Sequence, residues 1–449
     1  MKDNPPASAV SPPEADAARR VATPAGVFES ILRPFRRSEG GLILAILVVI
    51  LLTTLLDTQH TYWVDPGPSA WNILRHAAML GIFALGAAIV IISGGIDLSC
   101  GSVIAFSGSF CASLMVVLAR QEAQSLGIWN IVVAIAGTLV MGLLIGSFHA
   151  WLITVLGLPP FVATLATLVG LRSLARVMVE NVTQQVLGHR TTQIQIFDKQ
   201  FRYLATSVWI PVVLFVVLAG LAWLLMSRTV VGRHLHALGG NEQATRLSGI
   251  QTDRLKWLAY CIGAVLSSVA GILYIGATSV AEPQTLGVGY ELNAIAAAVV
   301  GGCSLQGGIG TIPGTVLGVF FLRIVMDAVA KVIKTNADIY EGLIVGCVVV
   351  VAVAFSQLRQ ARGMRKRFFA GPLGIVTIIN MSLFAGALGA LAGQNAALNM
   401  SLFAGALGAP AGQNAALGQI TIGGLTALTV FVLLWLARFW ESKRSIASP

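Results

Sequence analysis

Residues 76–119 read HAAMLGIFALGAAIVIISGGIDLSCGSVIAFSGSFCASLMVVLA, and this stretch decides the fold. Two apolar runs, 76–93 and 100–119, flank a short glycine-rich break, and Asp97 is the single Asp, Glu, Lys or Arg of the whole stretch. A helix that crosses a membrane needs about 20 apolar residues. The stretch therefore predicts two helices in lipid, joined by a break whose free backbone groups need protein or a water-filled cavity around them.

The whole chain shares this apolar character. Of its 449 residues, 56% are hydrophobic and 11% are charged, and the mean hydropathy is +0.82. About a quarter of the residues of a soluble domain are charged, so a soluble protein of this length is excluded. The net charge is +10, and 19 of the 29 Lys and Arg residues lie in four stretches, 1–40, 227–256, 357–367 and 438–444. Such clusters are typical of cytoplasmic loops and argue against nucleic-acid binding.

The apolar runs predict an all-α, polytopic transmembrane bundle of about ten core helices. We expect these helices near 41–56, 76–93, 100–119, 131–150, 161–179, 206–226, 255–278, 292–305, 312–332 and 339–356. An even number of crossings with a cytoplasmic N-terminus places the basic stretches 228–256 and 359–367 on the cytoplasmic side together. The short segment 292–305 either crosses fully or re-enters.

Composition divides the chain into three parts. We expect a mobile cytoplasmic tail over 1–40, a transmembrane domain over 41–357, and a C-terminal extension over 358–449 with one or two further spans. The extension holds a tandem 19-residue repeat, 380–398 and 399–417, whose copies differ only where Leu391 becomes Pro410. Near-identity at this short period indicates a recent duplication and not a solenoid. A strong apolar run, 419–439, follows the repeat.

The break in the first stretch has two compatible interpretations. Asp97 can accept hydrogen bonds from the first free N–H groups of the following helix, as a cap does. Alternatively, Gly95, Asp97 and Ser99 line a translocation path, because polar groups at membrane depth mark such paths.

Residues 232–250 read GRHLHALGGNEQATRLSGI and predict a short, capped cytoplasmic helix. Asn241 is a good N-cap, and Glu242 suits the positive start of a helix. Arg246 lies four residues later for an ion pair with Glu242, and Gly249 suits a left-handed stop.

This short helix carries a small apolar surface of Ala244, Leu247 and Ile250. A two-turn helix is marginal alone and gains stability by docking. We expect it to dock on an ATPase subunit; the alternative is packing against the chain's own helix ends.

A third constellation covers 282–310 and is rich in small residues. Tyr290, Glu291 and Asn293 stand at the entrance of the predicted helix, where Glu291 either caps the helix or faces the translocation path. The glycine cluster 301–310 lacks the strand and the spacing of a dinucleotide site. Its glycines repeat the pattern Gly94-Gly95-x-x-Leu98-x-x-Gly101 as Gly301-Gly302-x-x-Leu305-x-x-Gly308, a lead for internal repetition.

Arg323 and Asp327 lie four residues apart in the apolar run 312–332. They are expected to pair on one helix face, which lowers the cost of burying either charge. A proton relay through Asp327 is the alternative interpretation.

The chain has no pattern that predicts catalysis. A GxxxxGK[ST] motif is absent, the six histidines lack HxxxH or HExxH spacing, and no Ser-His-Asp grouping can be assembled. The five cysteines, without CxxC spacing, are interpreted as small core residues. We expect no enzyme activity, cofactor or metal, and any ATP must be used by another subunit.

Taken together, three stretches resemble the membrane permease subunits of bacterial carbohydrate ABC importers, the ribose-type family. They are GGIDLSCGSVIAFSG (94–108), GRHLHALGGNEQATRLSGI (232–250) and GYELNAIAAAVVGGCSLQGGIGTIPGTVLG (289–318), and the resemblance runs from about 41 to 357. The extension 368–449 departs from the family pattern, and so does Cys100, where valine is common.

The resemblance implies a multi-pass permease of the bacterial inner membrane that imports a sugar or polyol. Its implied partners are an ABC ATPase, a periplasmic sugar-binding protein, a second permease copy (identical or similar) and membrane lipid. The segment around 232–250 resembles the family's ATPase-coupling segment, so we assign coupling to Gly232, Arg233, Gly239, Gly240, Asn241, Glu242, Arg246 and Gly249. The translocation path or helix breaks are assigned to Gly95, Asp97, Ser99, Tyr290, Glu291 and Asn293.

Two rival functions follow from the same residues. An ion-coupled carrier for a small polar solute needs buried acids, and Asp97, Glu291 and Asp327 are available for that role. A static membrane scaffold is disfavoured, because broken, glycine-rich helices suit movement better than anchorage. The sequence does not identify the sugar or polyol.

Overall fold

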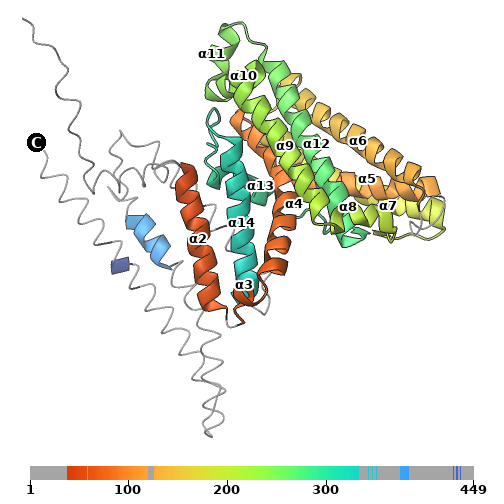
Figure 1. Cartoon of the computed structure of the whole chain (residues 1–449). Helices are drawn as coiled ribbons and strands as arrows, with labels where there is room; N and C mark the ends of the chain where they lie inside the picture. Colours follow the sequence, from red (N-terminus) through yellow and green to blue (C-terminus); the bar gives the residue numbers. More distant parts are fainter. Residues whose placement is uncertain are drawn as a thin grey trace, which may run out of the picture. The chain divides into compact units, whose positions relative to one another are not determined.

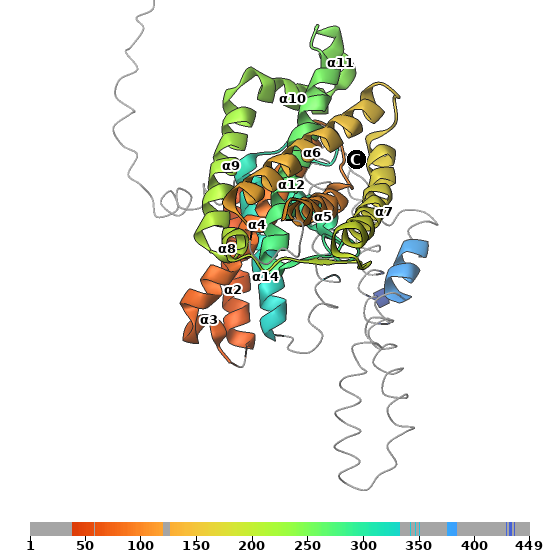
Figure 2. The same ribbon diagram turned by 90° about the vertical axis from the view of Figure 1, so that its right-hand side faces the viewer.

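Apolar helices make up most of the described chain. The computed structural model describes residues 38–57, 59–119, 126–332 and 375–383, with seven isolated positions beyond Val332. In chain order the elements are α2 Ser38–Leu56, α3 Thr61–Val64, α4 Pro66–Ile92, α5 Cys100–Ala119, α6 Ile128–Thr154, α7 Pro160–Leu187, β1 Ile194–Gln195, α8 Lys199–Thr206, α9 Trp209–Arg228, α10 Val230–Gly240, α11 Glu242–Leu247, α12 Thr252–Thr278, β2 Val280–Ala281, α13 Tyr290–Val300 and α14 Ile312–Val332 (Figures 1 and 2). The predicted helical membrane bundle is confirmed.

Seven described helices are long and apolar enough to cross a membrane, namely α4, α5, α6, α7, α9, α12 and α14. Gly40–Leu56 and Tyr290–Val300 are shorter apolar helices. Each of these nine corresponds to one of the ten predicted core helices. The tenth, 339–356, lies almost entirely outside the described residues, as do the N-terminal residues 1–37.

Some predicted boundaries were wrong. Helix α4 begins at Pro66 and not at 76, because Pro at the first helical position suits a helix start and Trp71 and Asn72 are tolerated near the end of a span. Helix α13 begins two residues earlier than predicted and ends at Val300. Its 11 residues make it about 16 Å long, too short to cross a hydrocarbon layer of about 30 Å alone.

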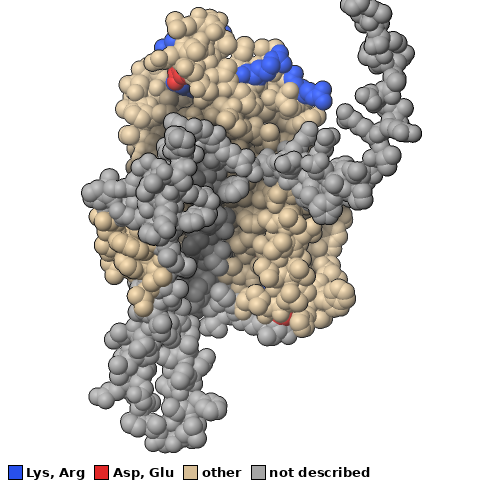
Figure 3. All heavy atoms as spheres, turned by 90° about the vertical axis from the view of Figure 1, so that its left-hand side faces the viewer, with Lys and Arg blue, Asp and Glu red and all other residues tan. Residues whose placement is uncertain are grey.

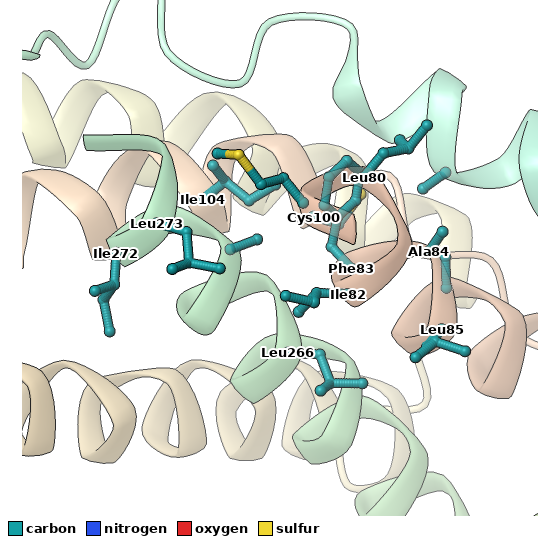
Figure 4. Packing of buried hydrophobic residues seen from close by; sticks show 14 of the residues in the cluster. Leu80, Ile82, Phe83, Ala84, Leu85, Cys100, Ile104, Leu266, Ile272 and Leu273 are labelled. Carbon is teal, nitrogen blue, oxygen red and sulfur yellow. The ribbon is translucent and has the colours of Figure 1, made fainter. Parts of the chain in front are cut away.

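Helix α12 is the central packing element, in contact with α4, α5 and α6. Small residues allow this approach: a Cβ on Gly86 of α4 would lie 2.9 Å from the Gly263 Cα, and one on Gly271 would lie 3.0 Å from the Gly108 nitrogen. Close packing of this kind is how helices associate in lipid. Figure 4 shows the buried cluster, with Leu80, Ile82, Phe83, Ala84 and Leu85 of α4, Cys100 and Ile104 of α5, and Leu266, Ile272 and Leu273 of α12.

The described cysteines fit the core role predicted for them. Cys100, Cys111 and Cys303 are buried, Cys261 is half-buried, and all four are free thiols. Cys347 lies outside the described residues. By contrast, large apolar side chains cover the outer faces of other helices, for example Leu144 of α6, Val169 of α7 and Val216 of α9, which are 58%, 62% and 62% exposed. An apolar surface of this extent suits contact with lipid.

The bundle has two distinct ends. At one end, called here the α11 end, lie α10 and α11 (Figure 1). At the other, called here the β end, the two-residue strands β1 and β2 pair antiparallel, with Ile194 opposite Ala281. Asp198 caps α8 there by accepting from the Phe201 nitrogen at 2.8 Å, and it also accepts from the Leu126 nitrogen at 2.8 Å. The stretch between the predicted helices 161–179 and 206–226 is thus partly helical and partly strand.

The chain divides into two compact units, Met1–Ser356 and Gln357–Pro449. In the second unit, the described residues 375–383 are helical, and the Ser382 hydroxyl donates to the Ile378 carbonyl at 2.7 Å. These helical residues fall within the apolar run 371–393, which with 419–439 is a candidate for the further spans. The rest of 371–393, most of 419–439 and most of the tandem repeat lie outside the described residues. The predicted tail also lies outside them except for its last three residues, which belong to α2.

Candidate functional site

The predicted cytoplasmic segment 232–250 forms one end of the bundle (Figure 1). Thr229 caps α10 by accepting from the Gly232 nitrogen at 3.1 Å, and Asn241 caps α11 by accepting from the Ala244 nitrogen at 3.0 Å. Gly249 has a φ of 81°, the left-handed conformation that ends a helix. The predicted cap and stop are therefore both present. The preceding helix α10, which carries Arg233, was not predicted.

The ion pairs of α11 differ from the predicted one. Arg246 does not pair with Glu242: its guanidinium contacts Asp253 at 3.2 Å, and Lys256 contacts Glu242 at 2.6 Å. Both partners lie on the first turns of α12, which folds back beside α11, so tertiary partners replace the local i,i+4 partner. The pairs tie α11 to the central helix α12, although exposed pairs contribute only about 0–1 kcal/mol each.

The predicted apolar surface of α11 is largely open. Leu247 is 89% exposed and Ala244 is exposed, whereas Ile250 is half-buried and packs against the core. Thr245, on the opposite side of the helix, is buried. The tip of α11 therefore presents an exposed leucine at the α11 end of the bundle.

Behind α11, three glycine-rich segments meet through their backbones. The Gly308 nitrogen donates to the Ile92 carbonyl oxygen at 2.9 Å. A Cβ on Gly239 would overlap that oxygen and would lie 2.5 Å from the Gly308 nitrogen and 3.0 Å from the Gly94 nitrogen. The coupling segment thus touches the end of α4 and the loop before α14 at one point, called here the glycine junction and defined by Ile92, Gly94, Gly239 and Gly308.

A cavity of about 290 Å³ opens beside the glycine junction. Its lining includes Gly95, Gly240, Asn241, Glu242, Lys256 and Tyr260. Five predicted site residues, Gly95, Gly239, Gly240, Asn241 and Glu242, therefore line one space between the helix break, the α10–α11 link and the start of α12. The Tyr260 hydroxyl is buried and has no hydrogen-bond partner among the described residues.

Asp97 acts within the break itself. One carboxylate oxygen accepts from the Ser99 nitrogen at 2.8 Å and from the Ser99 hydroxyl at 2.5 Å, and Asp97 is 4% exposed. Since α5 begins at Cys100, Asp97 orders the turn just before the helix and does not cap the helix's own N–H groups. This geometry supports the structural interpretation of Asp97, in modified form.

The entrance of α13 meets the start of α5. A Cβ on Gly101 would overlap the Glu291 carboxylate, one oxygen of which is buried without a hydrogen-bond partner among the described residues. Tyr290 stacks on Phe83 of α4, with ring centroids 5.8 Å apart and planes 7° from parallel. Asn293 is half-buried on the same helix. Gly101 lies four residues after Asp97, so Glu291 comes close to the end of the break although 190 residues separate Gly101 and Glu291 in the chain. Gly95, by contrast, lines the cavity beside the α10–α11 link.

The two copies of the repeated glycine pattern, 94–101 and 301–308, end their helices with the same hydrogen bonds, but they are offset by one residue. The nitrogens of Gly94 and Gly95 donate to Ile91 and Val90, and those of Gly302 and Cys303 donate to Val299 and Ala298, all at 2.9 Å. Gly94 and Gly302 both have positive φ, 85° and 97°. The sequence pattern aligns Gly94 with Gly301, but the hydrogen bonds that end each helix and the positive φ align it with Gly302. The structural equivalent of Gly94 is thus Gly302, one residue later.

The predicted Arg323–Asp327 pair is wrong. Asp327 is 5% exposed and accepts from the Tyr62 hydroxyl at 2.8 Å, while Lys331 lies 3.3 Å away and also donates to the Ser69 hydroxyl at 2.8 Å. These side chains form a structural cluster that joins α3, α4 and α14. Burial, together with the Asp327 hydrogen bond, raises the pKa of the Tyr62 hydroxyl, which therefore stays protonated.

Sequence reasoning missed Arg172. Its guanidinium donates to the carbonyl oxygens of Pro283, Gln284 and Leu286 at 2.9, 3.2 and 3.0 Å. The available signal was that the apolar run 161–179 contains two arginines, Arg172 and Arg176, and a charge at that depth needs a specific partner.

Comparison with known proteins agrees with this architecture. Residues 69–354 match the family described as the branched-chain amino acid transport system permease component. The chain is 32% identical over 326 residues to the ribose import permease protein RbsC of Escherichia coli (strain K12), covering 72% of this chain and 94% of that protein. It is 31% identical to RbsC of Bacillus subtilis (strain 168), over 74% and 96% of the two chains.

A third relative has a different printed substrate. The galactose/methyl galactoside import permease protein MglC of Escherichia coli (strain K12) is 28% identical, over 72% of this chain and 95% of that protein. No solved structure matches the chain. The matched region contains all seven candidate spans except the first three residues of α4, and it contains the whole α10–α11 segment. The chain therefore belongs to the permease family of ABC import systems, as a multi-pass membrane subunit whose ATPase is a separate protein.

Proposed function

We propose that this chain forms the translocation path for a sugar or polyol, which a periplasmic binding protein delivers and a separate ATPase drives across the membrane. The relatives named for import of ribose and of galactose or methyl galactoside support a sugar substrate, since they align over more than nine-tenths of their lengths. The glycine junction is the observation that carries the mechanism.

The mechanism begins at α11. Its exposed tip, with Leu247 at 89% exposure, suits a groove on the ATPase surface. Glu242 and Lys256 link the start of α11 to α12, so displacement of α11 moves a defined part of the bundle. The residues assigned to coupling, from Gly232 to Gly249, all belong to this segment or to its two caps.

The glycine junction then passes the displacement to the path. Gly239 has no space for a side chain between Ile92 and Gly308, so a shift of α10 toward these segments displaces the end of α4 or the loop before α14. Interiors packed this closely transmit strain and do not absorb it. ATP binding on the partner thus biases the bundle between two states through differential contacts at α11.

The path itself is assigned to the break and to the entrance of α13. Glu291 lies against Gly101, directly after the Asp97 turn, and Gln284 and Val288 of the preceding loop are exposed. Irregular backbone at membrane depth requires protein or water around it. A second permease copy opposite this surface, with lipid around the remaining faces, meets that requirement.

Charge supports a cytoplasmic α11 end and hence a cytoplasmic N-terminus. On the face in Figure 3, the described Lys and Arg side chains gather at the upper end of the molecule, the same end as α11 in Figure 1. Basic residues at span ends favour the cytoplasmic side.

Reconstitution tests the proposed function. The permease is placed in proteoliposomes with its ATPase and binding protein, and uptake of labelled pentoses, hexoses and polyols is measured with and without ATP. The proposal expects saturable, ATP-dependent uptake of at least one sugar or polyol, lost when the ATPase carries an inactivating substitution. Uptake that persists without any ATPase and follows an ion gradient would instead establish an ion-coupled carrier.

A further inference from the structure

Arg172 lies deep within a membrane helix. It stands twelve residues after the start of α7 at Pro160 and fifteen before its end at Leu187. At 1.5 Å per residue these separations are about 18 and 22 Å, which places the residue near the middle of the span. A charged side chain at this depth is costly and requires polar partners.

Backbone carbonyl groups are the partners. The Arg172 Nη1 donates to Pro283, Gln284 and Leu286, all in the loop 282–289 between β2 and α13. These carbonyls lie outside any helix, and Pro283 contributes no N–H group of its own. Lipid offers no hydrogen-bond donors to such carbonyl oxygens, so the one guanidinium supplies the donors that the bilayer lacks.

The other side of the loop rests on α5. A Cβ on Gly101 would overlap both the Gly287 carbonyl oxygen and the Glu291 carboxylate, and Gly287 has a φ of 71°, where a side chain would be strained. The loop is thus held between Arg172 of α7 and the first turn of α5. It leads directly into Tyr290 and Glu291, so its position fixes theirs.

We propose that Arg172 is a positioning residue that holds the loop 282–289 at membrane depth and thereby places Tyr290 and Glu291 at the translocation path. The inference rests on the proposed function only for the identity of the path. Without the guanidinium, three carbonyls lose their donor and the loop leaves its seat on Gly101. Arg176, one turn further along α7, pairs with Glu180 at 2.7 Å and has no contact with the loop among its hydrogen bonds and ion pairs in the described residues.

The test has a structural and a functional readout. A spin label is attached at Val288→Cys, a position 60% exposed, in the complete importer with Cys261 and Cys347 replaced by alanine. We expect Arg172→Met to increase label mobility several-fold, Arg172→Lys to restore part of the order, and Arg176→Met to match the parent protein. In proteoliposomes, ATP-driven uptake should fall at least ten-fold in Arg172→Met, while ATP hydrolysis stays within two-fold.

Assembly of each variant with the ATPase is checked first. If Arg172→Met does not assemble, Arg172→Lys replaces it in the comparison of label mobility. The inference is overturned if the label is as mobile in Arg172→Met as in the parent protein; if only Arg172→Lys assembles, the same comparison is made with that variant. It is also overturned if Arg176→Met loses as much order as the Arg172 variant. Failure of the parent protein to import any sugar or polyol would remove the proposed function, whereas the label mobility would still decide whether Arg172 positions the loop.

Discussion

Lys256, on the first turns of α12, contacts Glu242, the first residue of α11, at 2.6 Å. The pair joins the exposed end segment to the helix on which α4, α5 and α6 pack. Because Lys256 is only 19% exposed, water screens the pair less than an open surface pair. The role of this ion pair in coupling can therefore be measured with charge variants.

Reversing one charge of this pair should impair coupling. Glu242→Arg places two cations together at the start of α11, so we expect uptake per ATP hydrolysed to fall several-fold while membrane insertion is unchanged. The double variant Glu242→Lys with Lys256→Glu should recover much of the loss, as measured by uptake and ATPase assays in proteoliposomes. Normal transport by Glu242→Arg would remove the pair from the coupling mechanism.

Leu247 should dominate the contact with the ATPase. Replacing this leucine by aspartate introduces a charge into an interface that excludes water, which costs about 2 kcal/mol or more and weakens binding by at least about 30-fold. Leu247→Met keeps the apolar volume and should bind normally. Titration of the purified permease with its ATPase measures both dissociation constants, and equal values would place the docking surface elsewhere.

The glycine junction offers a matched pair of substitutions. Gly239→Ala inserts a methyl group where the Ile92 carbonyl and Gly308 leave no room, whereas a Cβ on Gly240 meets nothing within 4 Å. We expect Gly239→Ala to lower the free energy of unfolding by about 1–3 kcal/mol and to reduce uptake. Gly240→Ala should leave the free energy of unfolding unchanged, because the added methyl group has room. Thermal unfolding in detergent and uptake assays distinguish the two, and identical behaviour would contradict the observed packing.

The cluster around Asp327 should matter for stability and not for proton movement. Tyr62→Phe removes a hydrogen bond to a buried carboxylate and should destabilise the protein by about 1–3 kcal/mol. Tyr203→Phe, at a residue 63% exposed, is the control. The pH dependence of uptake should be the same in both variants. A shifted pH profile in Tyr62→Phe alone would favour a proton relay.

Cysteine labelling tests the orientation of the bundle. Ser248→Cys at the α11 end should resist a membrane-impermeant maleimide applied to intact cells, and Gln195→Cys at the β end should react, because we place these ends on opposite sides. Both residues are exposed. Labelling in permeabilised cells confirms that the Ser248→Cys thiol is reactive. Labelling of Ser248→Cys from outside would overturn the orientation and the coupling assignment together.

Local patterns predicted much of the architecture. Nine of the predicted core helices are present in the described residues, and Asn241 and Gly249 delimit α11 as expected. Hydrophobic length and helix caps are properties of neighbouring residues, so a single sequence contains them. The start of α4 and the end of α13 were misplaced because polar residues near a span end and small residues near a break blur the hydrophobic boundary.

Side-chain partners required the tertiary structure. Arg246 and Glu242 pair with residues of α12 and not with each other. Asp327 pairs with Lys331 and not with Arg323, although both lie four residues away, and it also accepts from the distant Tyr62. Arg172 contacts carbonyls more than 110 residues away. A charge in a packed bundle pairs with whichever group the fold brings near, and helix spacing alone does not specify that group.

The sequence by itself determined that this chain is a bundle of broken apolar helices with a capped basic segment at one end, because lipid requires continuous apolar length and backbone caps are local. Only the tertiary structure decided that Gly239 touches Ile92 and Gly308, and that Glu291 lies against Gly101. Those contacts join segments about 70 to 190 residues apart, and their closeness depends on how the helices pack around α12.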